Sequence, residues 1–159
     1  MTLAIDPGAS GGFAWKTARG DIDTYPMPEG MTEQAMFIWQ KLSELALIAG
    51  CAIENITVVL EKVGGYMPGN SGPASVKFAR HCGNLEAICF CYGASVVQVA
   101  PQTWMKSIGT MPKNKTERKN AIKEAMARKY PNIRVTLKTA DALGMLSWYL
   151  EKQNDNRTT

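Results

Sequence analysis

The first residues of the chain alternate between the two faces of a predicted strand. At a period of two, Leu3 and Ile5 lie on one face, while Ala4 and Asp6 lie on the other. A glycine-rich turn over residues 7–12 then leads into a second strand. The first strand therefore ends in an acid, and a buried carboxylate is costly unless a positive group meets it. The alternative is that Asp6 only caps the turn through its side chain.

Two further acids lie in hydrophobic segments. Residues 57–63 are β-branched and apolar up to Glu61, which predicts a central strand with a carboxylate near its end. Asp141 lies in the first turn of an apolar helix that begins near residue 140, where the helix dipole favours the ionised form. Because none of the three acids has an evident basic partner beside it, together they indicate a site for Mg²⁺ or Mn²⁺.

The remaining pattern predicts an α/β domain with a five-stranded mixed sheet. The other strands are expected over residues 13–17, 22–25 and 95–100, and helices over residues 32–50, 74–92 and 114–130. The first three strands should form an antiparallel meander, and the last two should be parallel strands reached by helical crossovers. A short turn or helix follows the fifth strand, and its Trp104 is expected to anchor the core.

The length indicates a single domain. A chain of 159 residues can form one core and is too short for two ordinary domains. We expect this domain to span residues 1–153 and residues 154–159 to form a disordered polar tail.

The four cysteines match no zinc spacing and have apolar neighbours, which is typical of reduced core thiols in a cytoplasmic protein. These cysteines are Cys51, Cys82, Cys89 and Cys91. No apolar run approaches the roughly 20 residues of a membrane span, so we expect no membrane role.

The positive charge is concentrated in one region. The formal net charge of +4 permits nucleic-acid binding without requiring it. Between residues 113 and 138, nine basic residues face only two acids, Glu117 and Glu124. The basic residues are Lys113, Lys115, Arg118, Lys119, Lys123, Arg128, Lys129, Arg134 and Lys138. A charged helix face is often merely solvated, but this excess favours contact with DNA, and we take Lys113, Lys115, Arg118 and Lys119 as DNA-binding candidates.

The three acidic motifs resemble those of the RuvC family of Holliday junction resolvases, which are ribonuclease H-like nucleases. The resemblance rests on residues 4–8 (AIDPG), 59–63 (VLEKV) and 140–143 (ADAL), and it extends over residues 2–151. It implies a ribonuclease H-like fold and a metal-dependent endonuclease that resolves branched DNA by symmetric nicking. It also implies a homodimer in the cytoplasm of a bacterium or of a phage-infected cell, without a small-molecule cofactor.

The resemblance also assigns residue roles. Asp6, Glu61 and Asp141 would be the catalytic residues and would hold two Mg²⁺ ions, for which Mn²⁺ can substitute. Where RuvC-like enzymes often carry an acid or histidine three residues before the helix acid, this chain has Lys138. A protonated lysine cannot ligate a cation, so one hypothesis is that Lys138 stabilises charge on the scissile phosphate. The alternative is a basic residue on the rim of a DNA groove.

Two segments near Glu61 are further candidates for DNA contact or assembly. Residues 64–73 are rich in glycine and proline, and Tyr66 would either stack on an unpaired base or fold back over its own loop. In the helix over residues 74–92, small residues recur every four positions, at Ala79, Gly83 and Ala87. They allow close packing either on the sheet or on a second copy, and the resemblance favours the second. On the same helix, Lys77 and Arg80 are DNA-binding candidates, and the lone His81 is more often a bystander than a ligand.

The sequence is compatible with three other functions. Another ribonuclease H-like nuclease, acting on RNA:DNA hybrids or on DNA in general, would use the same chemistry, because loops and dimer geometry select the substrate. A sugar-kinase or actin-like ATP-binding domain also begins with a strand that ends in an acid and a glycine turn, but it needs a second lobe. A DNA-binding module with an inactive site is the third alternative, and the three intact acids argue against it.

Overall fold

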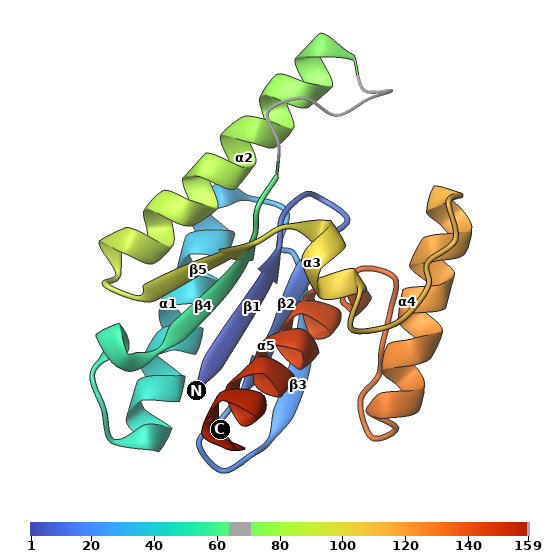
Figure 1. Ribbon diagram of the computed structural model, residues 1–159. Helices are drawn as coiled ribbons and strands as arrows, with labels where there is room; N and C mark the ends of the chain where they lie inside the picture. The colour runs from blue at the N-terminus through green and yellow to red at the C-terminus, as the bar shows by residue number, and fades with distance from the viewer. Residues whose placement is uncertain (64–70, 159) are drawn as a thin grey trace.

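The structure, a computed structural model, describes residues 1–63 and 71–158 and contains one mixed five-stranded sheet (Figure 1). The strands are β1 (Thr2–Asp6), β2 (Gly12–Lys16), β3 (Ile22–Pro26), β4 (Thr57–Glu61) and β5 (Ser95–Val99). Their order in the sheet is β3-β2-β1-β4-β5. β1 pairs antiparallel with β2 and parallel with β4, while β2 pairs antiparallel with β3 and β4 pairs parallel with β5. The predicted meander and the two parallel strands are confirmed.

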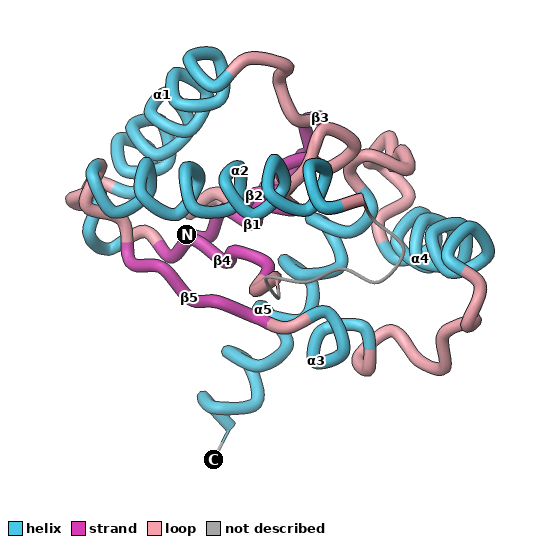
Figure 2. The backbone as a smooth tube through the Cα atoms, turned by 90° about the horizontal axis from the view of Figure 1, so that it is seen from above, coloured by secondary structure: helices cyan, strands magenta, loops and turns pink. Residues whose placement is uncertain are grey.

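Helices cover both faces of the sheet. They are α1 (Met31–Ala49), α2 (Gly72–Cys91), α3 (Pro101–Met105), α4 (Lys115–Lys129) and α5 (Ala140–Thr158), with a short 3-10 turn, η1 (Ile53–Asn55). α1 and α2 lie on one side of the sheet and α5 on the other (Figures 1 and 2). α4 packs against α5 and lies beyond the edge of the sheet in Figure 2. The α/β layering expected from the sequence is therefore observed.

The alternation in β1 divides its side chains between two cores. Leu3 and Ile5 are fully buried in the core beneath α1 and α2, together with Leu85 of α2. Ala4 belongs to the opposite core, where Leu143 of α5 is buried. Since successive side chains of a strand point to opposite faces, the acid that ends β1 lies on the α5 side of the sheet. The period of two thus decides which helix the first acid faces.

α4 is capped by Asn114, the first residue of the range 114–130 that the sequence predicts as a helix. The Asn114 side-chain Oδ1 accepts hydrogen bonds from the backbone amides of Thr116 at 2.9 Å and Glu117 at 3.2 Å. These bonds satisfy amides that have no partner inside the helix. Ile122 and Met126 are buried against the α5 side of the molecule, as their spacing predicts. The basic residues of α4 are therefore left on its other faces.

Two expectations about the chain are corrected. Residues 154–158 were expected to form a disordered tail, but they continue α5 to Thr158. No glycine or proline occurs between residues 151 and 158, so nothing in the sequence ends the helix earlier. All four cysteines are free thiols, and Cys89 is buried, but Cys91 is exposed and not in the core.

Among the helices that the structure describes, none is long and apolar enough to cross a membrane.

Candidate active site

The three predicted carboxylates line one cavity of about 490 Å³. β1 and β4 are parallel neighbours, and because Ile5 pairs with Leu60, Asp6 and Glu61 follow at equivalent positions at the same end of the sheet. The third acid, Asp141, lies in the first turn of α5 and lines the same cavity. The structure therefore brings together three acids that are far apart in the sequence.

Burial and mutual repulsion disfavour the charged forms of these acids. Asp6 is only 6% exposed, and its burial raises the pKa well above its ordinary value, with further increases from the charges of Glu61 and Asp141. Burial also raises the pKa of Glu61 to about 7. The pKa of Asp141 is raised by burial, an effect that nearby Lys119 partly offsets. A bound cation would stabilise all three charged forms.

Two of the acids already have partners from the protein. The Trp104 indole Nε1 donates to Glu61 Oε1 at 3.0 Å, and Lys119 Nζ lies 3.6 Å from Asp141 Oδ2. The other oxygen of Asp141, Oδ1, is buried and has no hydrogen-bond partner. Over the residues that the structure describes, no three acidic, histidine or cysteine side chains are arranged as a metal-binding group. The hard oxygen donors and the unpaired Oδ1 fit a divalent cation in chemistry, although the carboxylates as placed are not gathered around one point.

The alternative role for Asp6, as a cap of its own turn, is not what the structure shows. Among the described residues, no hydrogen bond joins the Asp6 carboxylate to the turn. The turn is closed by the Gly11 amide, which donates to the Gly8 carbonyl at 3.0 Å. Gly11 lies directly against the backbone of Asp6, since a Cβ there would be 2.1 Å from the Asp6 carbonyl oxygen. No hydrogen bond from the Asp6 carboxylate is needed to close this turn among the described residues, so the carboxylate is available to the cavity.

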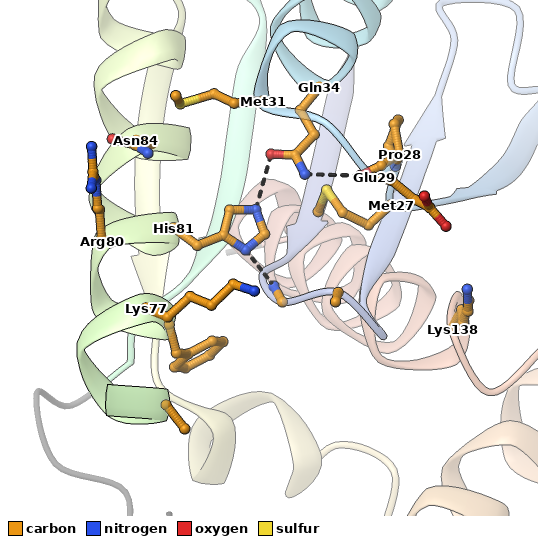
Figure 3. Close-up of a pocket in the computed structure, with 14 residues that line it drawn as sticks. Met27, Pro28, Glu29, Met31, Gln34, Lys77, Arg80, His81, Asn84 and Lys138 are labelled. Atoms are coloured by element: carbon orange, nitrogen blue, oxygen red, sulfur yellow. Dashed lines mark hydrogen bonds between the residues drawn. The ribbon is translucent and has the colours of Figure 1, made fainter. Parts of the chain in front are cut away.

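The predicted basic residues divide between two neighbouring cavities. Lys115, Arg118 and Lys119 of α4 line the acid cavity. Lys77 and Arg80 of α2 line a second cavity of about 590 Å³ (Figure 3). Lys113 precedes α4 and is exposed, and its carbonyl accepts a hydrogen bond from Arg118 Nη1 at 3.1 Å. Tyr66 lies outside the described residues.

Lys138 does not join the three acids. Its exposed side chain lines the second cavity (Figure 3). The backbone of Lys138 explains this position. Its carbonyl packs so closely on Gly12 that a Cβ on Gly12 would lie 2.6 Å from the carbonyl oxygen. This contact holds the Lys138 backbone beside Gly12, the first residue of β2. Lys138 precedes the start of α5, the helix that carries Asp141, by two residues. Among the described residues, the lysine that contacts one of these three acids is Lys119 of α4, which lies beside Asp141.

Sequence reasoning missed two residues that contact the site. Trp104 is 1% exposed, as expected of a core anchor, but its indole also donates to Glu61. His81 has a partner that the sequence did not reveal, because its Nδ1 accepts a hydrogen bond from the Gly8 amide at 3.2 Å (Figure 3). The only sequence signal for the contact between Trp104 and Glu61 was that Trp104 follows the end of a strand closely and was expected in the core. The N–H of a buried indole needs a hydrogen-bond acceptor nearby. Nothing local pointed to the contact of His81.

Comparison with known proteins identifies the fold. No protein-family model and no curated protein matches this sequence. Thermus thermophilus RuvC matches the structure with a TM-score of 0.51 and 16% sequence identity, over 96% of each chain. T. thermophilus RuvC in complex with a Holliday junction substrate matches with a TM-score of 0.52 and 15% identity, over 95% of each chain. The chain therefore has a RuvC-like, ribonuclease H-like fold, as the sequence resemblance implied.

Proposed function

We propose that the protein is a divalent-metal-dependent endonuclease that cleaves branched DNA, with the four-way junction as its substrate. The observation that carries this proposal is the shared cavity, in which buried Asp6 and partly buried Glu61 and Asp141 lie beside the cationic residues of α4. The RuvC neighbour described in complex with a Holliday junction supports the same class of substrate. The fold by itself would be compatible with several other functions.

The chain supplies binding and positioning for this chemistry. When bound, one or two Mg²⁺ ions provide the activated water and the charge stabilisation for phosphodiester hydrolysis, and Asp6, Glu61 and Asp141 are the residues that would hold them. Lys115 and Arg118 offer positive charge to a phosphate that enters the same cavity. Trp104 donates to one oxygen of Glu61, so the other is available to a cation.

The decisive experiment is cleavage of a mobile four-way junction in Mg²⁺, with Asp6→Asn as the control. We expect symmetric nicks across the branch from the wild-type protein and none from the variant, which should still bind the junction. A flap, a plain duplex and an RNA:DNA hybrid of the same sequence test substrate choice. Preferential cutting of the hybrid or the duplex would favour another ribonuclease H-like nuclease. If no substrate were cut in Mg²⁺ or Mn²⁺, the proposal would be wrong.

We propose further that α2 pairs with a second copy of the chain. Val76 and Phe90, near its two ends, are 69% and 62% exposed. Between them, Ala79, Gly83 and Ala87 are exposed small residues, and no atom lies within 4 Å of the position where a Gly83 Cβ would stand. An apolar helix face with a flat centre allows close approach of another backbone. Two copies would then present two acid cavities to one junction.

A further inference from the structure

The turn after Asp6 separates two cavities. Gly8 and Ala9 line the acid cavity of about 490 Å³ and also the second cavity of about 590 Å³. A backbone segment with open space on both sides gains little from packing. Its position therefore depends on the few specific contacts that it makes.

Two of these contacts come from one face of α2. The Gly8 amide donates to His81 Nδ1 at 3.2 Å. The Phe78 ring lies against the same residue, since a Cβ on Gly8 would be 3.2 Å from Phe78 Cε2. Phe78 and His81 are three positions apart, so their side chains are neighbours on the helix. Gly8 has a φ of +109°, a conformation that other residues rarely adopt, and this backbone shape directs its amide toward His81.

The imidazole is itself held in one orientation. His81 Nε2 lies 3.1 Å from Gln34 Oε1, and because Nδ1 accepts from Gly8, Nε2 carries the hydrogen and donates it to Gln34. Gln34 is 6% exposed, and its Nε2 donates to the Pro28 carbonyl at 2.8 Å. Figure 3 shows this continuous series of hydrogen bonds from the segment before α1, through α1 and α2, to the turn after β1. Every donor in the series has an acceptor.

We propose that His81 is a positioning residue of the active site. By accepting the Gly8 amide, it holds the turn that follows Asp6 and so determines where the Asp6 carboxylate stands relative to Glu61 and Asp141. Pro7 lies between Asp6 and Gly8, and its restricted φ transmits a displacement of Gly8 to Asp6. The metal-binding consequence of this inference rests on the proposed function, whereas the contact between His81 and Gly8 does not.

Two substitutions separate the hydrogen bond from the volume of the ring. In His81→Asn, the amide oxygen can take the place of Nδ1 and accept from Gly8, whereas His81→Leu retains bulk without an acceptor. In the metal-free protein, hydrogen exchange of the Gly8 amide, followed by NMR, should be slow in the wild type and in His81→Asn. The same amide should exchange at least tenfold faster in His81→Leu. Equal exchange in all three proteins would overturn the inference.

Metal affinity provides the second readout. Calorimetric titration with Mn²⁺ should show about tenfold weaker binding by His81→Leu, the usual scale for loss of a residue that orients metal ligands, and little change in His81→Asn. Gln34→Met removes the partner of His81 Nε2 without changing the turn, so its Mn²⁺ affinity should lie between those of His81→Asn and His81→Leu. This variant replaces His81→Leu in the test if His81→Leu does not fold. Unchanged Mn²⁺ affinity in a folded His81→Leu or Gln34→Met variant would also overturn the inference. A wild-type protein that bound no Mn²⁺ but protected Gly8 would instead contradict the proposed function.

Discussion

Burial and the surrounding side chains have opposing effects on the pKa of Glu61. Burial raises its pKa to about 7 and the charge of Asp141 adds to that increase, while the hydrogen bond from Trp104 and the charge of Lys119 lower it. The indole N–H stabilises the ionised carboxylate because it can only donate. A single buried N–H therefore helps to keep a proposed metal ligand charged near neutral pH.

Replacing Trp104 by phenylalanine tests this role. Trp104→Phe keeps most of the buried volume but removes the donor to Glu61, so the pKa of Glu61 should rise and its ionised fraction at pH 7 should fall. We expect cleavage at pH 7 to drop about tenfold and to recover partly at pH 9. Rates measured from pH 6 to 9 check this, with Trp148→Phe, on α5 and outside the acid cavity, as the control. A loss that was independent of pH would contradict it.

The raised pKa values of the acids also predict how stability changes with pH. The folded protein keeps a proton on Glu61 up to about pH 7, whereas the unfolded chain releases it near 4.5. The folded state therefore binds more protons in this interval, and the stability of the metal-free protein should fall as the pH rises from 4.5 to 7. Asp6, whose pKa is raised in the same direction, should add to the fall.

Asp6→Asn provides the test of this pH dependence. Removing the acid relieves its repulsion with Glu61 and Asp141, so in EDTA the variant should melt at a higher temperature than the wild type at pH 8. The difference should shrink toward pH 5, where protonation of Glu61 removes its repulsion of Asp6. Thermal melts of both proteins across this range check the prediction. A variant that melted lower than the wild type at pH 8 would contradict it.

At the scale of elements, close packing between α3 and α5 fixes the position of Trp104. A Cβ on Gly144 of α5 would lie 2.8 Å from Trp104 Cζ3 and 3.3 Å from Ile108 Cδ1. Gly144 is also one turn along the helix from Asp141. The absence of a side chain at this position thus lets the indole that contacts Glu61 lie against the helix that carries Asp141.

Gly144→Ala should destabilise the protein even though alanine is the better helix former. In an exposed helix this change would stabilise by about 1 kcal/mol, but here the added methyl group must displace a buried indole, which costs about 1–3 kcal/mol. We expect a lower denaturation midpoint and weaker Mn²⁺ binding. Gly72→Ala, at the first residue of α2 and with nothing within 4 Å, is the control and should not destabilise. Equal effects of the two changes would rule out the packing argument.

At the scale of the whole molecule, the two sides of the sheet have different proposed tasks. α4 and α5, which meet on one side, provide cations and an acid to the shared cavity. α2, on the other side, has its exposed apolar face together with Phe78 and His81, which contact the turn after β1. Partner contact and positioning of Asp6 would therefore depend on the same helix.

Charge placed on the exposed face of α2 tests the proposed dimer. Phe90→Glu would put a charge into an apolar contact between copies, and removing that charge from water is costly. We expect a monomer by sedimentation velocity and loss of paired nicking, with single nicks remaining. Leu47→Glu, at an 83% exposed position on α1, controls for loss of exposed apolar surface and should leave assembly unchanged. A wild-type protein that sediments as a monomer with and without junction DNA would contradict the dimer.

The sequence by itself determined the elements and the acids of this protein. The alternation in β1, the apolar run of β4 and the cap of α4 are local patterns, and local patterns are sufficient to predict strands, helices and which residues end them. Parallel pairing then brings the ends of β1 and β4 to one edge of the sheet. The sequence grouped Asp6, Glu61 and Asp141 because each acid lies in an apolar element, and the pairing of β1 with β4 gives the physical reason why the first two lie close together.

Only the tertiary structure decided which side chains assist these acids. Trp104 and Glu61 are 43 positions apart, and Gly8 and His81 are 73 apart, so no periodicity links them. The position of Lys138 could not be predicted for the same reason. The packing of its carbonyl on Gly12 directs the lysine to the second cavity, while Lys119 reaches Asp141. Hydrogen bonds and ion pairs between distant elements depend on how those elements pack, and packing is a property of the whole fold.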